Sequence, residues 1–187
     1  MRLLALSVVV VTLIFSSEVQ AQSYITETGH VEFTSSVPLH SFTGTSDHLT
    51  GLIDFDENLV DFYIDLKTLD TGNGKRDRDM YSTLETDEFP FAEFTGTLQS
   101  SFDLASTDEQ NVTVAGDFTI HGVTHSIEVD GSLQHRNNTL SLEASWILNL
   151  NDYEIEPPGI LFYRVDEKIE IRIDAQLEPQ DNESNEM

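Results

Sequence analysis

The sequence contains no cysteine and few basic residues, and both absences exclude whole classes of function. Without cysteine there is no disulfide framework, no thiolate nucleophile and no thiolate zinc site. Only 9 Lys and Arg residues stand against 34 Asp and Glu residues in the 187-residue chain, which gives a formal net charge of −25. Binding to nucleic-acid phosphates and to anionic membrane surfaces depends on Lys and Arg. We therefore expect neither nucleic acid nor an anionic bilayer surface as a partner.

The motifs of common hydrolases are also missing, because neither Gly-x-Ser-x-Gly nor His-Glu-x-x-His occurs. Pairs of carboxylates arise in any acidic chain, so their presence alone indicates no activity. His121 and His125 are close in sequence, but four residues along a strand separate two side chains by about 13 Å. This distance favours turn or surface histidines over metal ligands unless a turn brings them together. We expect a protein that is not an enzyme, with no catalytic residues, no metal and no cofactor.

The two ends of the chain differ from its middle. Residues 1–21 combine a basic residue, the apolar run Leu3 to Phe15 and a small residue at Ala21, which is typical of a cleaved signal peptide. The run is too short to span a bilayer comfortably, and a retained anchor is the alternative. We expect a periplasmic or secreted protein with no integral membrane span after cleavage. At the other end, residues 178–187 are acidic and almost without apolar residues, which predicts a disordered tail.

Between these ends, apolar and polar residues alternate with a period of two, which is typical of half-buried antiparallel strands. The clearest apolar rows run from Val60 to Leu66, from Val112 to Ile120, from Leu140 to Leu150 and from Val165 to Leu177. Further strands are predicted near 30–36, 39–46, 49–56, 91–102 and 122–135. Helical spacing of Arg76, Asp79, Met80, Thr83 and Leu84 predicts one short helix over 76–85. The fold expected is all-β, with about eight strands.

Long strands with one continuous apolar face either pack as a sandwich or close into a barrel. Closure also removes exposed sheet edges, so we expect residues 22–177 to form one antiparallel β-barrel. The inward rows mix aromatic residues with small ones, among them Gly51, Gly96, Gly116, Gly131 and Ala144. Small residues leave internal volume for one slim ligand unless bulky neighbours fill it. The sequence leaves both alternatives open.

Four segments, in their order along the chain, resemble a known family. They are Leu49–Asp56 (LTGLIDFD), Leu69–Asn73 (LDTGN) with Arg76-Asp77 after it, Phe89–Phe94 (FPFAEF) and Gly116–Thr124 (GDFTIHGVT). The order resembles the YceI-like family of exported, lipocalin-like barrels, over residues 23–177. The resemblance implies an extended barrel with an elongated apolar tunnel that takes a polyisoprenoid, an isoprenoid quinone or a fatty-acid-like lipid. The helical segment departs from the family's pattern, because it is slightly shorter and has Asp79 where a basic residue or His is often found.

We therefore expect an exported lipid-binding protein that carries or sequesters a long apolar chain inside the barrel. The residues expected to contact the ligand are Phe33, Phe55, Phe62, Met80, Leu84, Phe94, Phe118 and Trp146. The alternative is a solid-cored β-domain that acts as an adhesion or partner-binding module without a small-molecule ligand. A lipid-modifying enzyme ranks last, because the inward rows offer few polar side chains. Whether the protein forms a homodimer is left open.

Basic residues are concentrated beside the predicted helix, at Lys75, Arg76 and Arg78. Since the resemblance places this segment near the tunnel mouth, one interpretation is contact with a lipid head group. The other is local pairing with Asp77 and Asp79, which contributes well under ~1 kcal/mol. The sequence favours neither interpretation.

Overall fold

The computed structural model describes residues 23–37, 40–156 and 166–180. Eight antiparallel strands form a closed barrel in chain order, and the last strand pairs with the first. The strands are β1 (Ser23–Val37), β2 (His40–Asp54), β3 (Leu59–Asp65), β4 (Phe91–Leu98), β5 (Gln110–Ile120), β6 (Val123–Arg136), β7 (Thr139–Asn149) and β8 (Lys168–Pro179). The helical elements are η1 (Leu66–Thr68), α1 (Gly74–Thr83) and η2 (Leu150–Tyr153). The predicted all-β barrel of about eight strands with one short helix is confirmed.

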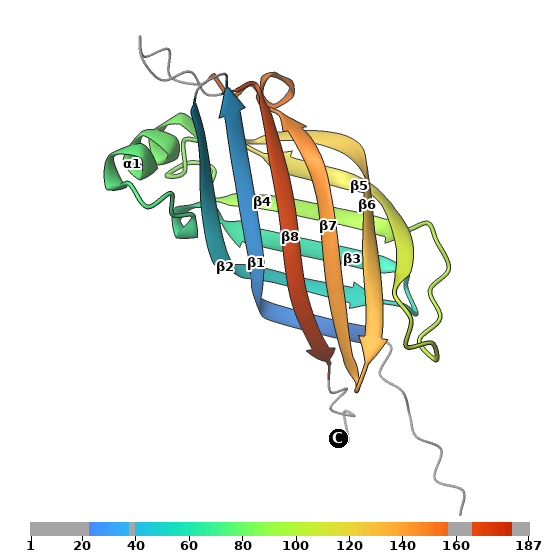
Figure 1. Ribbon diagram of the computed structural model, residues 1–187. Helices are drawn as coiled ribbons and strands as arrows, with labels where there is room; N and C mark the ends of the chain where they lie inside the picture. The colour runs from blue at the N-terminus through green and yellow to red at the C-terminus, as the bar shows by residue number, and fades with distance from the viewer. Residues whose placement is uncertain (1–22, 38–39, 157–165, 181–187) are drawn as a thin grey trace, which may run out of the picture.

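The barrel has two different ends (Figure 1). One end carries α1, η1 and η2, and is called the α1 end. The opposite end carries the loop of residues 99–109 between β4 and β5, and is called the base. In Figure 1, β2, β1, β8 and β7 cross in front of β3 and β4, and α1 projects at the upper left.

Two tight hairpin turns connect the strands β5, β6 and β7. His121 (φ 55°) and Gly122 (φ 73°) connect β5 to β6, and Asn137 (φ 53°) and Asn138 (φ 66°) connect β6 to β7. Positive φ at both central residues is the backbone of a type I′ turn, whose twist matches that of the flanking strands. These turns fix the register of the long β5, β6 and β7 strands.

The β2 strand is continuous, and the prediction of two strands over 39–46 and 49–56 is wrong. Gly29 of β1 pairs with Leu49, and Val31 pairs with Ser46. One residue of β1 therefore lies opposite two residues of β2, which is a β-bulge. The bulge interrupts the alternation of apolar and polar residues without ending the strand, and in the sequence this interruption resembles a turn.

The α1 helix begins two residues earlier than predicted, because Asn73 caps it. The Asn73 side chain accepts hydrogen bonds from the backbone N–H groups of Lys75 (3.0 Å) and Arg76 (3.3 Å). Leu84 is the C-terminal cap, and Glu85 after it has a φ of 49°. A side-chain cap satisfies backbone donors that the helix cannot.

The predicted signal peptide, residues 1–21, lies outside the described residues, as does most of the predicted acidic tail. The first two residues of the predicted tail, Glu178 and Pro179, are ordered in β8, where they lie opposite Ile25 and Tyr24 of β1 respectively. Among the described residues, no helix has the length and apolar character needed to cross a bilayer.

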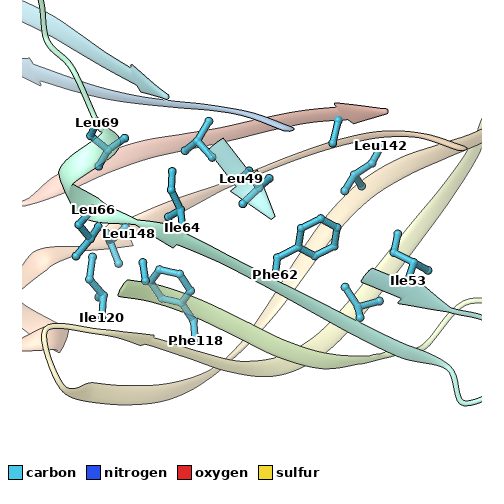
Figure 2. Packing of buried hydrophobic residues seen from close by; sticks show 14 of the residues in the cluster. Leu49, Ile53, Phe62, Ile64, Leu66, Leu69, Phe118, Ile120, Leu142 and Leu148 are labelled. Carbon is cyan, nitrogen blue, oxygen red and sulfur yellow. The ribbon is translucent and has the colours of Figure 1, made fainter. Parts of the chain in front are cut away.

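Apolar side chains from all eight strands point into the barrel. Figure 2 shows this arrangement for Leu49, Phe62, Phe118, Leu142 and Leu148. The rows predicted from the alternation lie inside within the strands, and the residues between them lie outside. In the last row, Val165 lies outside the described residues, and Glu167, which precedes β8, is exposed. Burial of these side chains is the main favourable contribution to folding.

Candidate functional site

The barrel contains an internal cavity of about 600 Å³. Every strand contributes apolar side chains to its wall. One from each strand, in chain order, are Phe33, Leu49, Phe62, Phe94, Phe118, Val129, Trp146 and Ile171. Volumes of 300–1,000 Å³ are typical of small-molecule sites in proteins. The interior is therefore not completely filled by side chains.

Seven of the eight residues predicted to contact a ligand lie on this wall. Phe33, Phe62, Phe94, Phe118 and Trp146 come from five different strands, and Met80 and Leu84 come from α1 and its C-terminal cap. The structure therefore brings them together around one cavity. Contact with a ligand stays a prediction for each of them.

Phe55, the eighth residue, does not line the cavity. It follows the last residue of β2, and its ring stacks on Phe102 at a centroid distance of 5.1 Å. It also packs edge to face against Tyr24 at 6.0 Å. Alternation along β2 places Phe55 on the inner face, but the strand has ended there, and the ring helps to close the base.

The base of the barrel is filled. Tyr24, Leu140 and Leu177 have no exposed surface, and none of them lines the cavity. The Tyr24 hydroxyl lies 3.1 Å from Nε2 of His135, whose Nδ1 lies 2.8 Å from the carbonyl oxygen of Leu104 in the 99–109 loop. Burial raises the pKa of the Tyr24 hydroxyl. The cavity is therefore closed at this end by packed side chains and a hydrogen-bonded loop.

The sequence suggests that small residues on the inner face leave internal volume. At two of the glycines on this face, a neighbouring ring fills that volume. A Cβ at Gly44 would lie 2.2 Å from the Phe33 ring, and a Cβ at Gly51 would lie 2.0 Å from the Phe62 ring. These rings occupy the space above the glycines. The volume that remains depends on rings lying flat against glycines instead of extending across the interior.

Polar groups on the cavity wall are concentrated at the α1 end, which places the mouth there. They include Ser35 and Ser41 at the facing ends of β1 and β2, together with Asn73, Lys75, Arg76, Asp79 and Thr83 of α1 and its cap. Spacing of three and four residues brings Arg76, Met80 and Thr83 to one face of α1. The same face thus combines apolar and charged side chains at the mouth.

Two side chains anchor α1 to the barrel. The Tyr81 hydroxyl donates to the carbonyl oxygen of Leu69 at 2.6 Å and lies 3.1 Å from that of Lys67. The Asp77 carboxylate accepts hydrogen bonds from the backbone N–H and the hydroxyl of Thr71, at 3.0 and 2.6 Å. These bonds fix the orientation of the helix over the mouth.

Sequence reasoning missed several residues of the wall. Phe42, Leu69 and Ile155 all line the cavity. Phe42 lies in a predicted strand, and its pairing opposite the inward-facing Ser35 places it on the inner face. Ile155, which is 1% exposed, follows η2 and carries no periodic signal at all.

The histidines singled out in the sequence bind neighbouring segments. His121 Nδ1 lies 3.1 Å from the Tyr153 carbonyl oxygen, and its Nε2 lies 3.3 Å from a Glu85 carboxylate oxygen. His125 Nε2 lies 2.8 Å from the Asp152 carbonyl oxygen. They join η2 and the turn after α1 to the β5–β6 hairpin. In the part of the chain that the structure describes, no group of three or more His, Asp or Glu side chains is placed to hold a metal ion.

A closed, eight-stranded, up-and-down antiparallel barrel with an apolar internal cavity defines a lipocalin-like β-barrel. The family model described as a YceI-like domain matches residues 19–177, and the chain belongs to this family. A UPF0312 protein of Pseudomonas putida is 30% identical over 118 residues, which are 58% of this chain and 59% of that relative.

Solved structures show the same fold. A polyisoprenoid binding domain from Saccharophagus degradans, implicated in plant cell wall breakdown, matches with a TM-score of 0.72 and 21% identity over 86% of this chain and 99% of that one. BcnA of Burkholderia cenocepacia matches with a TM-score of 0.63 and 11% identity over 80% of this chain and 95% of that one. Because the sequence identities are this low, the similarity to these two structures shows a shared fold and nothing further.

Proposed function

We propose that this protein binds a long-chain apolar lipid, such as a polyisoprenoid, an isoprenoid quinone or a fatty-acid-like molecule, inside the barrel. The observation that carries the proposal is the cavity of about 600 Å³, with an apolar wall and a polar mouth. The Saccharophagus degradans domain of the same fold, described as polyisoprenoid binding, supports it. The alternative of a solid-cored module is disfavoured by the cavity, which such a module has no reason to keep.

Apolar burial is sufficient to hold such a ligand. Each buried CH₂ group contributes up to ~0.8 kcal/mol, so about twenty buried carbons contribute ~16 kcal/mol before the costs of binding are subtracted. That gross value approaches the practical ceiling for non-covalent affinity. In this proposal the protein sequesters or carries the lipid by binding its chain and shielding it from water.

We further propose that the protein acts outside the cytoplasm, in the periplasm or as a secreted protein. The predicted signal peptide supports this location, because a carrier that removes a lipid chain from water is useful between membranes. Amino-terminal sequencing of the protein from the producing cell tests it. We expect the sequence to begin near Gln22. A protein that still begins at residue 1 or 2 would contradict export with cleavage of a signal peptide.

The direct test of binding is native mass spectrometry of the purified protein, before and after organic extraction and reloading with a polyprenol. Trp146 supplies a second signal, because it is the only tryptophan of the chain and lies on the cavity wall. We expect a bound lipid mass and a change in Trp146 fluorescence on loading. If no lipid co-purifies and none can be loaded, the proposal fails.

A pair of variants connects binding to the cavity. Ala92 of β4 lines the cavity, whereas Ala115 of the neighbouring β5 points outward and does not. Ala92→Phe fills part of the cavity and should reduce lipid loading at least about tenfold, since several buried CH₂ contacts are lost. Ala115→Phe is the control and should load like the unchanged protein. Thermal melting of both variants separates lost binding from lost folding, and equal loading of the two contradicts the cavity as the site.

A further inference from the structure

We propose that Arg76 at the mouth binds an anionic head group, a phosphate or a carboxylate, of the lipid whose chain lies in the cavity. This inference rests on the proposed function and deepens it by naming the class of lipid. The basis is the arrangement of charges at the α1 end, which leaves one cation at the mouth without an anion.

The other charged residues that α1 places on the cavity wall, Lys75 and Asp79, are paired with each other. Lys75 Nζ lies 2.6 Å from an Asp79 carboxylate oxygen, and Lys67 Nζ lies 2.6 Å from an Asp87 carboxylate oxygen. The Asp77 carboxylate is held by Thr71. In each case a short contact already engages the charged group.

Arg76 is different, although the chain contains 34 acidic residues. Its guanidinium carbon lies 4.5 Å from the centroid of the Phe42 ring, and both residues line the cavity. Across the described segments, no hydrogen bond or ion pair engages the side-chain N–H groups of Arg76. A cation over an aromatic ring keeps its charge, and a guanidinium carries five N–H donors. A charged, preoriented donor group is therefore available at the mouth.

Glu93 of β4 also borders the cavity and carries a negative charge. It lies between the inward-facing Ala92 and Phe94 in the alternation of β4, and its side chain is exposed. Its carboxylate is thus on the outer face of the barrel. Arg76 remains the unpaired charge on the side of α1 that faces the cavity.

The chemistry of the guanidinium specifies the partner. Phosphates and carboxylates present two oxygen atoms at the spacing of the guanidinium fork, and charge-assisted bonds of this kind are the strong ones. A neutral alcohol offers one oxygen and no charge. With the chain in the apolar cavity, the head group is held at the mouth, where partial exclusion of water strengthens the attraction.

The test compares three probes that share the same isoprenoid chain and differ in their head group: geranylgeraniol, geranylgeranyl phosphate and geranylgeranoic acid. Isothermal titration calorimetry of the intact purified protein gives each dissociation constant. We expect both anionic probes to bind at least about tenfold more tightly than the alcohol at low salt. This difference in affinity should become smaller as the salt concentration rises, because salt screens the charges. A preference for only one of the two anionic probes distinguishes phosphate from carboxylate as the natural head group.

Variants of the same helix provide the control. Arg76→Met keeps an apolar stem over Phe42 and should abolish the preference, measured as the ratio of the dissociation constant of geranylgeraniol to that of each anionic probe. Arg78→Met removes a cation that is exposed and outside the cavity wall, and should keep the preference. Arg76→Lys keeps the positive charge but loses the paired N–H donors of the guanidinium, so it should keep part of the preference for the anionic probes. The inference is overturned if the Arg76→Met protein still prefers the anionic probes over the alcohol. It is also overturned if Arg78→Met abolishes this preference as completely as Arg76→Met does.

The outcomes also separate this inference from the proposed function. If the alcohol and both anionic probes bind equally, lipid binding stands and the role of Arg76 is wrong. If none of the three probes binds, the proposed function itself fails.

Discussion

Phe33 and Phe62 show how single residues determine the width of the cavity. Each ring lies against a glycine on the neighbouring strand β2, Gly44 and Gly51 respectively. Any side chain at either glycine displaces the ring toward the interior. These two contacts therefore control both packing and internal volume.

Gly51→Ala tests this relation. The added Cβ would lie 2.0 Å from Cδ1 of Phe62, so the ring must move, and overpacking of this kind typically costs about 1–3 kcal/mol. Urea unfolding measures the loss of free energy of unfolding. Gly74→Ala is the control, because only Arg78 Nη1, at 3.7 Å, lies near the added carbon, and its effect should stay within about 1 kcal/mol. Equal effects of the two substitutions would show that the Phe62 ring is not held by the glycine.

The α1 helix is an element held by few contacts. It has no buried residue, and its position depends on the Asn73 cap, the Tyr81 hydroxyl and the Asp77–Thr71 pair. The strands, by contrast, are held by ladders on both sides. We infer that α1 opens locally at lower free energy than the barrel, which suits an element at a mouth.

Asn73→Ala removes the cap from α1 and should cost about 1 kcal/mol. The loss should be local. Hydrogen exchange of the α1 amides should become faster, while the amides of β5, β6 and β7 keep their rates and serve as the internal control. Uniform acceleration across the strands would mean that the helix and the barrel unfold as one unit.

The closed barrel as a whole carries a strong excess of negative charge. The formal net charge is −25, and the ion pairs that Lys and Arg form among the described residues lie at the surface. Surface pairs contribute little, whereas like charges spread over one small barrel repel each other. Closure pairs the first strand, β1, with the last strand, β8, within this same charged surface.

We therefore expect salt to stabilise the protein. Raising the ionic strength from about 0.01 M to about 0.15 M shortens the screening length from about 30 Å to about 8 Å and weakens the repulsion. The Tm from thermal unfolding should rise by several degrees, equally in NaCl and KCl. A fall in Tm would show that attractive pairs outweigh the repulsion, and a difference between the two salts would indicate specific ion binding.

Much of the architecture could be predicted because it depends on local periodicity. The inward rows of β3, β5, β7 and β8 follow from alternation, and the cavity-facing side of α1 follows from the spacing of Arg76, Met80 and Leu84. The bulge in β2 could not be predicted, because it is defined by pairing with β1. The predicted place of Phe55 on the cavity wall is wrong because alternation gives the face of a residue but not its height in the barrel.

The order of residues along the chain was sufficient for the all-β class, for the family and for which side chains point inward. The class and the inward rows depend on alternation between near neighbours, and the family depends on four short motifs in a fixed order. The position of the closed end, the volume that stays empty and the isolation of the Arg76 charge were decided by three-dimensional packing. Each results from contacts between distant segments: Phe55 with Phe102, Tyr24 with His135, and Arg76 with Phe42. Such contacts exist only after the barrel has closed, because closure brings these segments together.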